Sequence, residues 1–426
     1  MTSRPSFSRI AATGWLTAAS ASTFLLTLPM DTLPLLPAIL AWGAVWASWK
    51  DMGRSAKQQS SVLFLCGSLL VGWALFAGTP MDWESLVGHN MPLLTMFVAV
   101  SFLALTNPSE PDSNLPTGRK GVLSTMLTCH LLGSVINLSI IFVVADRLTR
   151  TSRLTGAQVQ ATMRCYTAAA FWSPFFVAIG VALTYAPGSE WLRTMPPGML
   201  LTLPMFALTY RDAMKNSDGN FHGYPLSRDS LIIPISLALA VLTAHQLLPQ
   251  LSILTLISIL APIGAWLFMN GRPRQQHCIE FINKRLANIS SQFAMFMTAG
   301  VFSTGIAMLI ATYPDFLALH FERFSPLLFM VLSAVMLLVA LIGIHPVVSI
   351  ALISPFLTPL GADPNQLAFM FLFVWGVGTA SSPLSGVGLA MVGRYQVRSR
   401  DILALNWHYL LIMWLMAGLM NFIWFG

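Results

Sequence analysis

Residues 131–142 read LLGSVINLSIIF, and residues 341–352 read LIGIHPVVSIAL. Laid over each other without a gap, the two stretches share a leucine, a glycine, a serine and an isoleucine in the same order: Leu131/Leu341, Gly133/Gly343, Ser139/Ser349 and Ile140/Ile350. Further along the chain, Ser173-Pro174 and Ser382-Pro383 match in the same way, each followed by an apolar stretch that contains a glycine. The separation between matched residues falls only from 210 in the first stretch to 209 at the Ser-Pro pairs and 208 in the apolar stretches that follow. These matches predict an internal repeat.

The composition is that of a membrane protein. Of the 426 residues, 55% are hydrophobic and 9% are charged, against roughly a quarter charged in ordinary soluble proteins. The four cysteines lie singly, which predicts neither a disulfide framework nor a CxxC site. The net charge of +7 is expected to reflect basic cytoplasmic loops, with no nucleic-acid partner. A transmembrane helix needs about 20 apolar residues, and charge-poor stretches occupy residues 10–30, 32–49, 60–78, 91–106, 122–145, 161–187, 195–210, 230–247, 251–270, 289–312, 327–357, 366–392 and 402–425.

The basic residues favour two of these segments as re-entrant hairpins. If every segment simply crossed the membrane, the loop 146–160 with its three arginines would lie outside, against the rule that Lys and Arg concentrate in cytoplasmic loops. The conflict disappears if segments 122–145 and 327–357 enter and leave on the same side. With the N-terminus inside, only Arg193 and Arg323 of the 23 basic residues then fall outside. The sequence thus predicts an all-α polytopic membrane protein with about eleven transmembrane helices, two hairpins and the C-terminus outside.

The length of segment 327–357 gives separate support for a hairpin. As one straight helix it would be about 46 Å long at 1.5 Å per residue, beyond a hydrocarbon core of about 30 Å. Gly343-Ile344-His345-Pro346 lies near its middle, and Pro346 would break a helix there because proline lacks an N–H and clashes with the preceding turn. A long tilted or kinked helix is the alternative.

The chain then divides into an N-terminal transmembrane helix (1–31), a first repeat (32–210), a cytoplasmic linker (211–229) and a second repeat (230–426). A cleaved signal peptide is the alternative for the first segment. Each repeat contains its hairpin and then a Ser-Pro-broken helix, 161–187 or 366–392. Because an odd number of crossings precedes the second copy, its hairpin enters from the opposite face. Inverted repeats of this kind are typical of secondary transporters, although repeats also occur in channels and scaffolds.

Histidine is the one ionisable residue type expected inside the membrane. Arg164 falls in the first turn of its segment, from which its side chain is expected to reach the interface. A charged ligand would therefore be held by neutral groups, and half-helix N-termini offer free N–H groups and a positive dipole end. Pro174, Pro346 and Pro383 mark three of the expected breaks. The four expected places are Gly133–Asn137, Trp172–Pro174, Gly343–Pro346 and Thr379–Ser385.

The polar side chains at these places are the candidate ligand-binding residues. In GVGTASSPLSGVG, residues 376–388, four hydroxyls are suited to a carboxylate or a sodium ion: Thr379, Ser381, Ser382 and Ser385. The alternative is that the small residues only permit close helix packing. The first repeat offers Ser134, Asn137, Thr167 and Ser173, where Asn137 can both donate and accept or merely tie the hairpin arms.

The histidines and Trp172 are assigned less specific roles. His345 could bind the solute, carry a coupling proton or be structural. His130 and His408 are expected to be packing or interface residues, and Trp172 to line the cavity. The chain contains no HExxH, nucleophile elbow, Walker A loop or paired carboxylates, so neither an enzyme nor a metal site is expected. The GxG in residues 376–378 lacks the strand and acidic residue of a dinucleotide loop.

This arrangement resembles the ion transporter superfamily, which includes divalent anion/sodium symporters, citrate transporters and arsenite permeases. The resemblance covers nearly the whole chain in layout: eleven helices, one hairpin from each side and a broken helix after each. It implies an elevator-type carrier, usually a homodimer. The symporters carry Ser-Asn-Thr at each hairpin tip. In this chain the corresponding tips are Gly133–Asn137 and Gly343–Pro346, and neither contains that triplet. The resemblance by itself therefore specifies neither sodium coupling nor a dicarboxylate.

The sequence thus predicts a secondary transporter of a small anionic solute in the lipid of the cytoplasmic membrane, as importer or exporter. It would be coupled to Na⁺ or H⁺ and need no cofactor beyond a coupling ion. The competing prediction is a non-transporting membrane scaffold or a membrane subunit of a larger complex.

Overall fold

The computed structural model describes residues 7–28, 35–106, 115–150, 152–217, 219–226, 229–269, 271–314, 324–357 and 360–426. The boundary expected between residues 31 and 32 lies outside these ranges. The described residues form helices and no β-strand, with one isolated antiparallel bridge between Thr117 and His222. The chain divides into two compact units. Unit 1 comprises residues 1–105, 248–323 and 347–361, and unit 2 comprises residues 106–247, 324–346 and 362–426. Each expected repeat contributes residues to both units.

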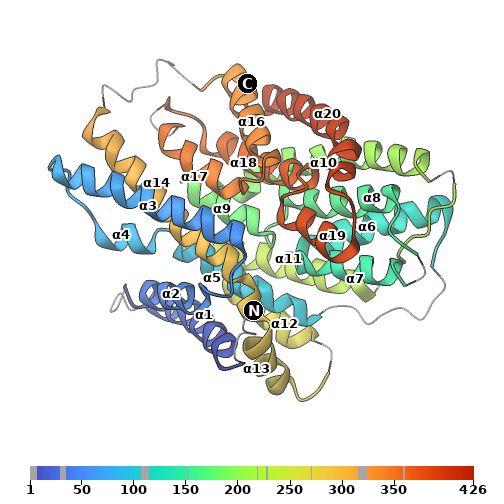
Figure 1. The fold of residues 1–426 in the computed structure, drawn as a ribbon, viewed down its shortest axis with the longest axis horizontal. Coiled ribbons are helices and arrows are strands. Elements are labelled where there is room, and N and C mark those ends of the chain that lie inside the picture. The colour runs from blue at the N-terminus through green and yellow to red at the C-terminus, as the bar shows by residue number, and fades with distance from the viewer. Residues whose placement is uncertain are drawn as a thin grey trace. The chain divides into compact units, whose positions relative to one another are not determined.

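Unit 1 holds α1 (Phe7–Thr27), α2 (Leu35–Ser48), α3 (Arg54–Phe76), α4 (Trp83–Gly88), α5 (Met91–Ser101), α12 (Ile253–Phe268), α13 (Arg274–Lys284), η3 (Leu286–Ile289), α14 (Ser290–Thr312) and, from Val347 onward, α17 (Pro346–Leu357). The short helix η1 (Phe102–Thr106) follows α5. Helices α3 and α14 lie side by side (Figure 1). A Cβ atom on Gly67 would stand 2.8 Å from the Phe302 backbone, and one on Gly305 would stand 2.8 Å from the Gly67 carbonyl oxygen. Small residues therefore permit this close helix packing.

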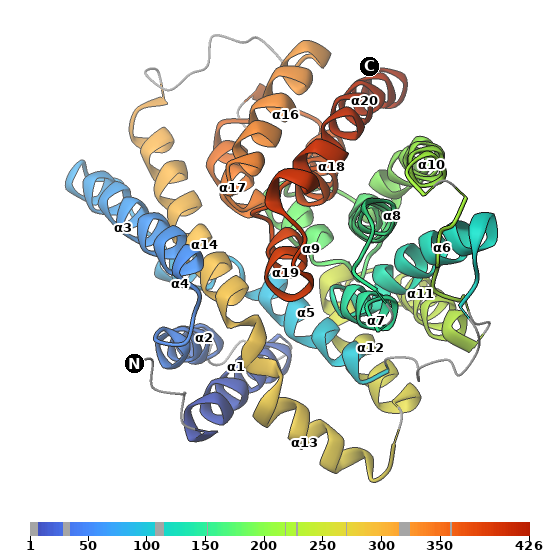
Figure 2. The ribbon, with the colours of Figure 1, turned by 45° about the vertical axis from the view of Figure 1, so that its right-hand side comes forward.

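Unit 2 holds α6 (Gly118–Ile136), α7 (Ser139–Leu148), α8 (Gly156–Thr167), η2 (Ala168–Phe171), α9 (Val177–Tyr185), α10 (Trp191–Lys215), α11 (Asp229–Leu247), α16 (Pro326–Leu341), α18 (Pro364–Ser381), α19 (Gly386–Tyr395) and α20 (Ser399–Phe425). Its central element is α18, which contacts α8, α9, α10, α16 and α20 (Figure 2). Residues 365–378 of α18 are all buried. From Leu367 to Gly378 this helix is apolar all round, as expected for a helix enclosed by others.

The helices are long and apolar enough to make this a multi-pass membrane protein. Among the described residues, six helical stretches can cross a membrane by length and composition: Arg9–Thr27, Arg54–Phe76, Leu86–Thr106, Leu286–Thr312, Pro364–Tyr395 and Ser399–Phe425. Five shorter apolar helices accompany them. On α20, the large apolar side chains of Leu411, Leu415, Leu419 and Phe422 are exposed, as on a lipid-facing surface. The count of eleven crossings stays a prediction.

The backbone breaks at each place where the sequence analysis expected an interruption. Asn137 and Leu138 separate α6 from α7, and residues 342–345 separate α16 from α17. Residues 172–176, the first Ser-Pro break, separate η2 from α9. Residues 382–385 separate α18 from α19. These residues and Ser381, the last residue of α18, are called the second Ser-Pro break. Proline accounts for two of these interruptions, since Pro174 and Pro383 have no N–H to continue a helix.

Candidate functional site

The two Ser-Pro breaks have the same local hydrogen bonds. Ser173 N donates to the Ala169 carbonyl at 2.9 Å, and Phe176 N donates back to the Ser173 carbonyl at 3.3 Å. Phe175 N donates to Ser173 Oγ at 3.2 Å. The serine hydroxyl thus accepts the N–H two residues further on, which turns the chain out of the helix.

The second break repeats this pattern atom for atom. Ser382 N donates to the Gly378 carbonyl at 2.9 Å, and Ser385 N donates to the Ser382 carbonyl at 3.3 Å. Leu384 N donates to Ser382 Oγ at 3.3 Å. In both copies the next helix begins four residues after the serine, at Val177 and Gly386. The matched Ser-Pro pairs of the sequence therefore form matched turns.

Side chains satisfy the carbonyl groups that lose their helical partners at the breaks. Thr379 O has no helical donor because Pro383 lacks an N–H, and Ser385 Oγ donates to it at 2.8 Å. Asn406 Nδ2, on α20, donates to Ala380 O at 3.2 Å. At the first break, Trp191 Nε1 on α10 donates to Trp172 O at 2.8 Å. In each copy the helix after the half-helix supplies this side chain.

The first interhelical turn is tied directly to the first Ser-Pro break. Asn137 has φ 52° and ψ −141°, a backbone conformation that L-residues rarely adopt. Its Nδ2 donates to Phe175 O at 3.1 Å, and Ser173 Oγ donates to Ser134 O at 2.5 Å. Ser134 Oγ donates to Leu131 O within its own helix. The polar groups predicted at Ser134, Asn137 and Ser173 therefore come together in one loop cluster, where they also hold the backbone.

The turn after α16 lies against the second Ser-Pro break. Gly343 has φ +94°, and a Cβ atom there would stand 2.8 Å from the Leu384 side chain. Only glycine fits this close approach without strain. The His345 ring packs edge-on against Trp375 of α18, with 5.0 Å between ring centroids. His345 is thus placed beside the core helix that leads into the second break, and Pro346 is the first residue of α17.

The two breaks are connected through α18 and η2. A Cβ on Gly376 would stand 2.4 Å from the Phe171 ring and 2.9 Å from Thr167 O. Gly376 therefore lets the last turns of α18 approach the helix end that precedes the first break. Thr167 itself is fully buried and donates its hydroxyl hydrogen to Arg164 O.

The predicted serine hydroxyls of the second break differ in the hydrogen bonds that they already make. Ser382 Oγ accepts from Leu384 N, and Ser385 Oγ donates to carbonyls and accepts from Gly388 N at 3.0 Å. Ser381 is fully buried, and its Oγ has no hydrogen-bond partner in the described part of the chain. A buried hydroxyl of this kind is costly unless something binds it. Ser381 is therefore the member of the predicted set best suited to contact a ligand.

His130 is held from both sides. Its Nε2 accepts from Trp172 Nε1 at 3.1 Å, and its Nδ1 lies 2.9 Å from Cys165 O. The acceptor role of Nε2 places the single ring proton on Nδ1, which donates to that carbonyl. His130 thus packs α6 against η2 and α8, and Trp172 is committed to this contact.

Arg164 corrects one expectation. It was expected at a helix start with its side chain reaching the interface, but it lies in the last turn of α8 with 0% of its side chain exposed. Its Nη1 pairs with Asp212 Oδ2 of α10 at 2.9 Å, and its Nε donates to Asn406 Oδ1 at 2.7 Å. Its guanidinium also lies over the Tyr409 ring. The sequence signal was a lone arginine inside an apolar segment, which marks a buried pair when another segment supplies the acid.

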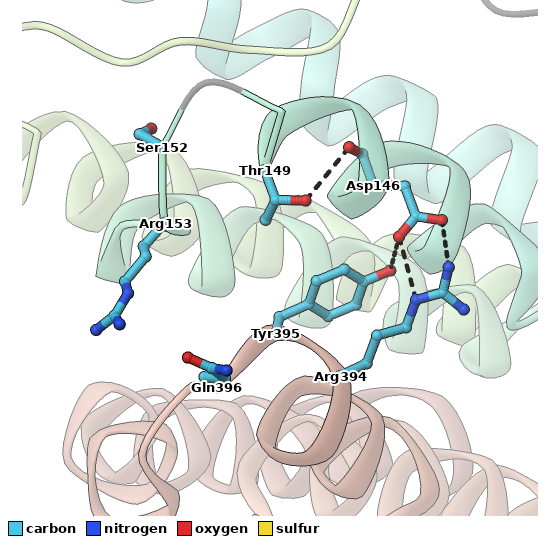
Figure 3. Close-up of a pocket in the computed structure, with 7 residues that line it drawn as sticks. All are labelled: Asp146, Thr149, Ser152, Arg153, Arg394, Tyr395 and Gln396. Atoms are coloured by element: carbon cyan, nitrogen blue, oxygen red, sulfur yellow. Dashed lines mark hydrogen bonds and ion pairs between the residues drawn. The ribbon is translucent and has the colours of Figure 1, made fainter.

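A polar pocket of about 270 Å³ lies where α7 and α19 end. Arg394 Nη2 pairs with Asp146 Oδ2 at 2.6 Å, and Tyr395 Oη donates to Asp146 Oδ1 at 2.7 Å (Figure 3). These groups join α7 of the expected first repeat to α19 of the expected second repeat. The pocket also carries Thr149, Ser152, Arg153 and Gln396. None of these residues was predicted as a site residue.

Comparison with known proteins identifies a solved structure with a similar fold. No family model and no curated protein matches the chain. The structure is similar to the crystal structure of the YdaH transporter of Alcanivorax borkumensis, with a TM-score of 0.56, 14% sequence identity, 86% of this chain covered and 98% of that chain covered. The chain is thus a multi-pass membrane protein with a transporter fold. Among the described residues, no group of three or more His, Cys, Asp or Glu side chains is placed to hold a metal ion.

Proposed function

We propose that the protein is a secondary active transporter of a small anionic solute, a carboxylate or an oxyanion, across the cytoplasmic membrane. The observation that carries the proposal is the pair of matched Ser-Pro breaks in unit 2, each with a half-helix starting directly after it. Irregular backbone at membrane depth is tolerated where it lines a polar cavity. Paired broken helices of this kind are typical of transporter binding sites. The similarity to a transporter structure supports the same conclusion.

The chemistry of the breaks suits an anion or a coupling cation held by neutral groups. The first turns of α9 and α19 carry N–H groups that have no acceptor within their own helices, of which Ile179 N and Gly388 N are bonded to Phe176 O and Ser385 Oγ just before each helix. The helix dipole favours negative charge there. Ser381 adds a hydroxyl that is buried and without a partner among the described residues. Exposed backbone carbonyls and hydroxyls are ligands suited to Na⁺. Either Na⁺ or H⁺ can serve as the coupling ion in this proposal.

Unit 2 is the proposed moving body. It contains both Ser-Pro breaks and the turn between α6 and α7, so a ligand bound at the breaks would travel with it. Unit 1 would then be the fixed scaffold of an elevator-type carrier and would form the homodimer contact. Its closely packed α3 and α14 are suited to a rigid scaffold.

A ligand panel tests the proposal. Purified protein would be screened for thermal stabilisation by carboxylates, inorganic oxyanions and cations, with sodium chloride or choline chloride at equal ionic strength. A ligand present at 100 times its dissociation constant stabilises a protein by about 2.7 kcal/mol, so a saturable shift is expected for at least one solute. A scaffold would show none. Ser381→Ala and Asn137→Gly should lose the shift, whereas Ser258→Ala in α12 should keep it.

Labelling of single cysteines tests the expected topology. In a chain freed of its four native cysteines, Leu115→Cys and Arg150→Cys flank α6 and α7. If these helices form a re-entrant hairpin, an impermeant maleimide should label both positions from the same face. Labelling from opposite faces would contradict the hairpin and the orientation that depends on it.

A further inference from the structure

A buried polar network extends from α10 through α8 and α20 to the second Ser-Pro break. Asp212, with 18% of its side chain exposed, pairs with Arg164, which donates to Asn406 Oδ1. Asn406 Nδ2 then donates to Ala380 O, the carbonyl directly before Ser381. Arg164 and Asn406 are both fully buried. The network is continuous from the edge of the unit to the break.

The orientation of the Asn406 amide follows from its surroundings. On one side Arg164 Nε can only donate, and on the other side the carbonyls of Ala380 and Ile402 can only accept, at 3.2 and 2.9 Å. The opposite amide orientation would place donor against donor and oxygen against oxygen. The Arg164 Nε–H and the two carbonyls therefore hold the amide so that it donates to Ala380 O at the break and to Ile402 O of its own helix.

Ala380 O needs this donor because of the break itself. In a continuous helix it would accept from Leu384 N, but that N–H donates to Ser382 Oγ. A buried carbonyl without a partner costs free energy comparable to a lost hydrogen bond. Asn406 replaces the missing helical bond and so determines where the Ala380–Ser381 peptide lies. Ser381 carries the buried hydroxyl with no partner among the described residues.

Helix packing alone does not account for the charge. A buried arginine is costly even when paired, and apolar residues of similar volume pack as well. Arg164 uses three of its nitrogen atoms on three different groups, since Nη2 also donates to Leu405 O at 2.6 Å. A planar guanidinium is suited to holding several acceptors in a set geometry. The arrangement is better explained by the positioning of one backbone segment than by a contribution to the free energy of unfolding.

We propose that Arg164 and Asn406 are positioning residues for ligand binding at the second Ser-Pro break. Through the Asn406 amide they hold the Ala380–Ser381 peptide in the geometry that the bound solute or ion meets, without touching that ligand themselves. This inference rests on the proposed function, because it assigns the break a ligand.

The test uses variants that separate the two roles of Asn406, as donor to Ala380 O and as acceptor from Arg164 Nε. Asn406→Asp keeps an acceptor for the arginine but removes the N–H groups that face Ala380 and Ile402, and Asn406→Ala removes both. Asn421→Ala is the matched control, because Asn421 is also fully buried on α20 but accepts from Gln366 at the other end of α18. Amide hydrogen exchange of peptides covering residues 378–390 is the readout, since it reports local opening.

Both Asn406 variants should speed exchange in residues 378–390 by about tenfold, and Asn421→Ala should leave it within about twofold. Arg164→Lys should act like Asn406→Asp, and the double variant should add little, because both act through one amide. If Asn406→Ala fails to fold, the exchange rates of Asn406→Asp and Arg164→Lys still test the proposal. Equal exchange in the Asn406 and Asn421 variants would overturn the proposal.

A second arm follows protection of the same peptides by sodium chloride, with choline chloride as control. If Na⁺ is the coupling ion, the wild-type chain should be protected, and Asn406→Asp should raise the half-saturating sodium concentration by about tenfold, with Asn421→Ala within about twofold. A wild-type chain that responds to no sodium and no solute of the panel would count against the proposed function. The exchange comparison without ligand would still decide whether Arg164 and Asn406 position the break.

Discussion

Ser173 Oγ and Ser382 Oγ make the same hydrogen bond in two helix breaks that lie more than two hundred residues apart, accepting the N–H of the second residue after each serine at 3.2 and 3.3 Å. Identical turns are expected when two copies of one structural unit keep the same Ser-Pro pair. The two serines differ in their surroundings, because Ser173 Oγ also donates to Ser134 O, whereas the N–H that Ser382 Oγ accepts belongs to the half-exposed Leu384.

Ser173→Ala should therefore destabilise the protein more than Ser382→Ala. The alanine leaves Phe175 N and Ser134 O without their partner in a buried position, at a cost of about 1–3 kcal/mol. Thermal unfolding in detergent measures the difference. Ser258→Ala is the control, because Ser258 Oγ donates to a carbonyl of its own helix, Leu254 O. An equal loss of stability in Ser258→Ala would show that the turn has no special contribution.

Substitution of Asn137 separates backbone strain from ligand contact. Glycine accepts φ 52° without cost, whereas alanine is strained there by about 1–3 kcal/mol. Asn137→Gly should thus be more stable than Asn137→Ala, although both lose the bond to Phe175 O. If Asn137 also contacts the solute, both variants should lose the ligand-induced thermal shift. A fully retained shift in Asn137→Gly would limit Asn137 to a structural role.

Gly376→Ala should disrupt the contact between α18 and η2. The added methyl group would lie 2.4 Å from the Phe171 ring, so either the ring or the helix has to move, at about 1–3 kcal/mol. Gly393→Ala in α19 is the control, since nothing lies within 4 Å of its added Cβ. That variant should gain up to about 1 kcal/mol from helix propensity. Unfolding temperatures that fall equally in the two variants would contradict the close approach.

Two ion pairs of unit 2, Arg164–Asp212 and Arg394–Asp146, should respond differently to the loss of their arginine. Arg164→Gln removes the fully buried member of a pair whose Asp212 is 18% exposed and keeps Arg211 beside it, so the cost should be about 1–3 kcal/mol. Arg394→Gln removes an exposed partner of Asp146 and should cost about 0–1 kcal/mol. Only the second pair should weaken clearly with added salt, because water and ions screen it. Unfolding measured at low and high sodium chloride checks both expectations.

Local chemistry made the positions of the breaks predictable. Proline lacks an N–H wherever it stands, so Ser173-Pro174, Ser382-Pro383 and His345-Pro346 predict interruptions without knowledge of the fold. The repeat, read from short matches, placed the two Ser-Pro pairs in equivalent positions, and their hydrogen bonds agree in detail. The low charge content predicted a membrane protein, because each unpaired charge in lipid is costly.

The partners of the breaks were not predictable, because they come from helices distant in sequence. Nothing near Ala380 indicates that Asn406 supplies its donor, or that Trp191 does so for Trp172. The sequence placed Arg164 at an interface because it falls in the first turn of its expected segment, whereas its acid partner, Asp212, lies near the end of α10, beyond α9. Such pairs depend on how helices pack, and hydrophobic patterning leaves that open.

The sequence by itself determined that this chain is a helical membrane protein and where its helices are interrupted, since both follow from local composition and from proline. Only the tertiary structure decided how the predicted serine hydroxyls are bonded, because Ser382 Oγ and Ser385 Oγ make hydrogen bonds at the break while Ser381 Oγ has no partner among the described residues. It also decided that a buried arginine hydrogen-bonds Asn406, which donates to Ala380 O at the second break. Hydrogen bonds between distant groups depend on distances of about 3 Å, which only the packed helices establish.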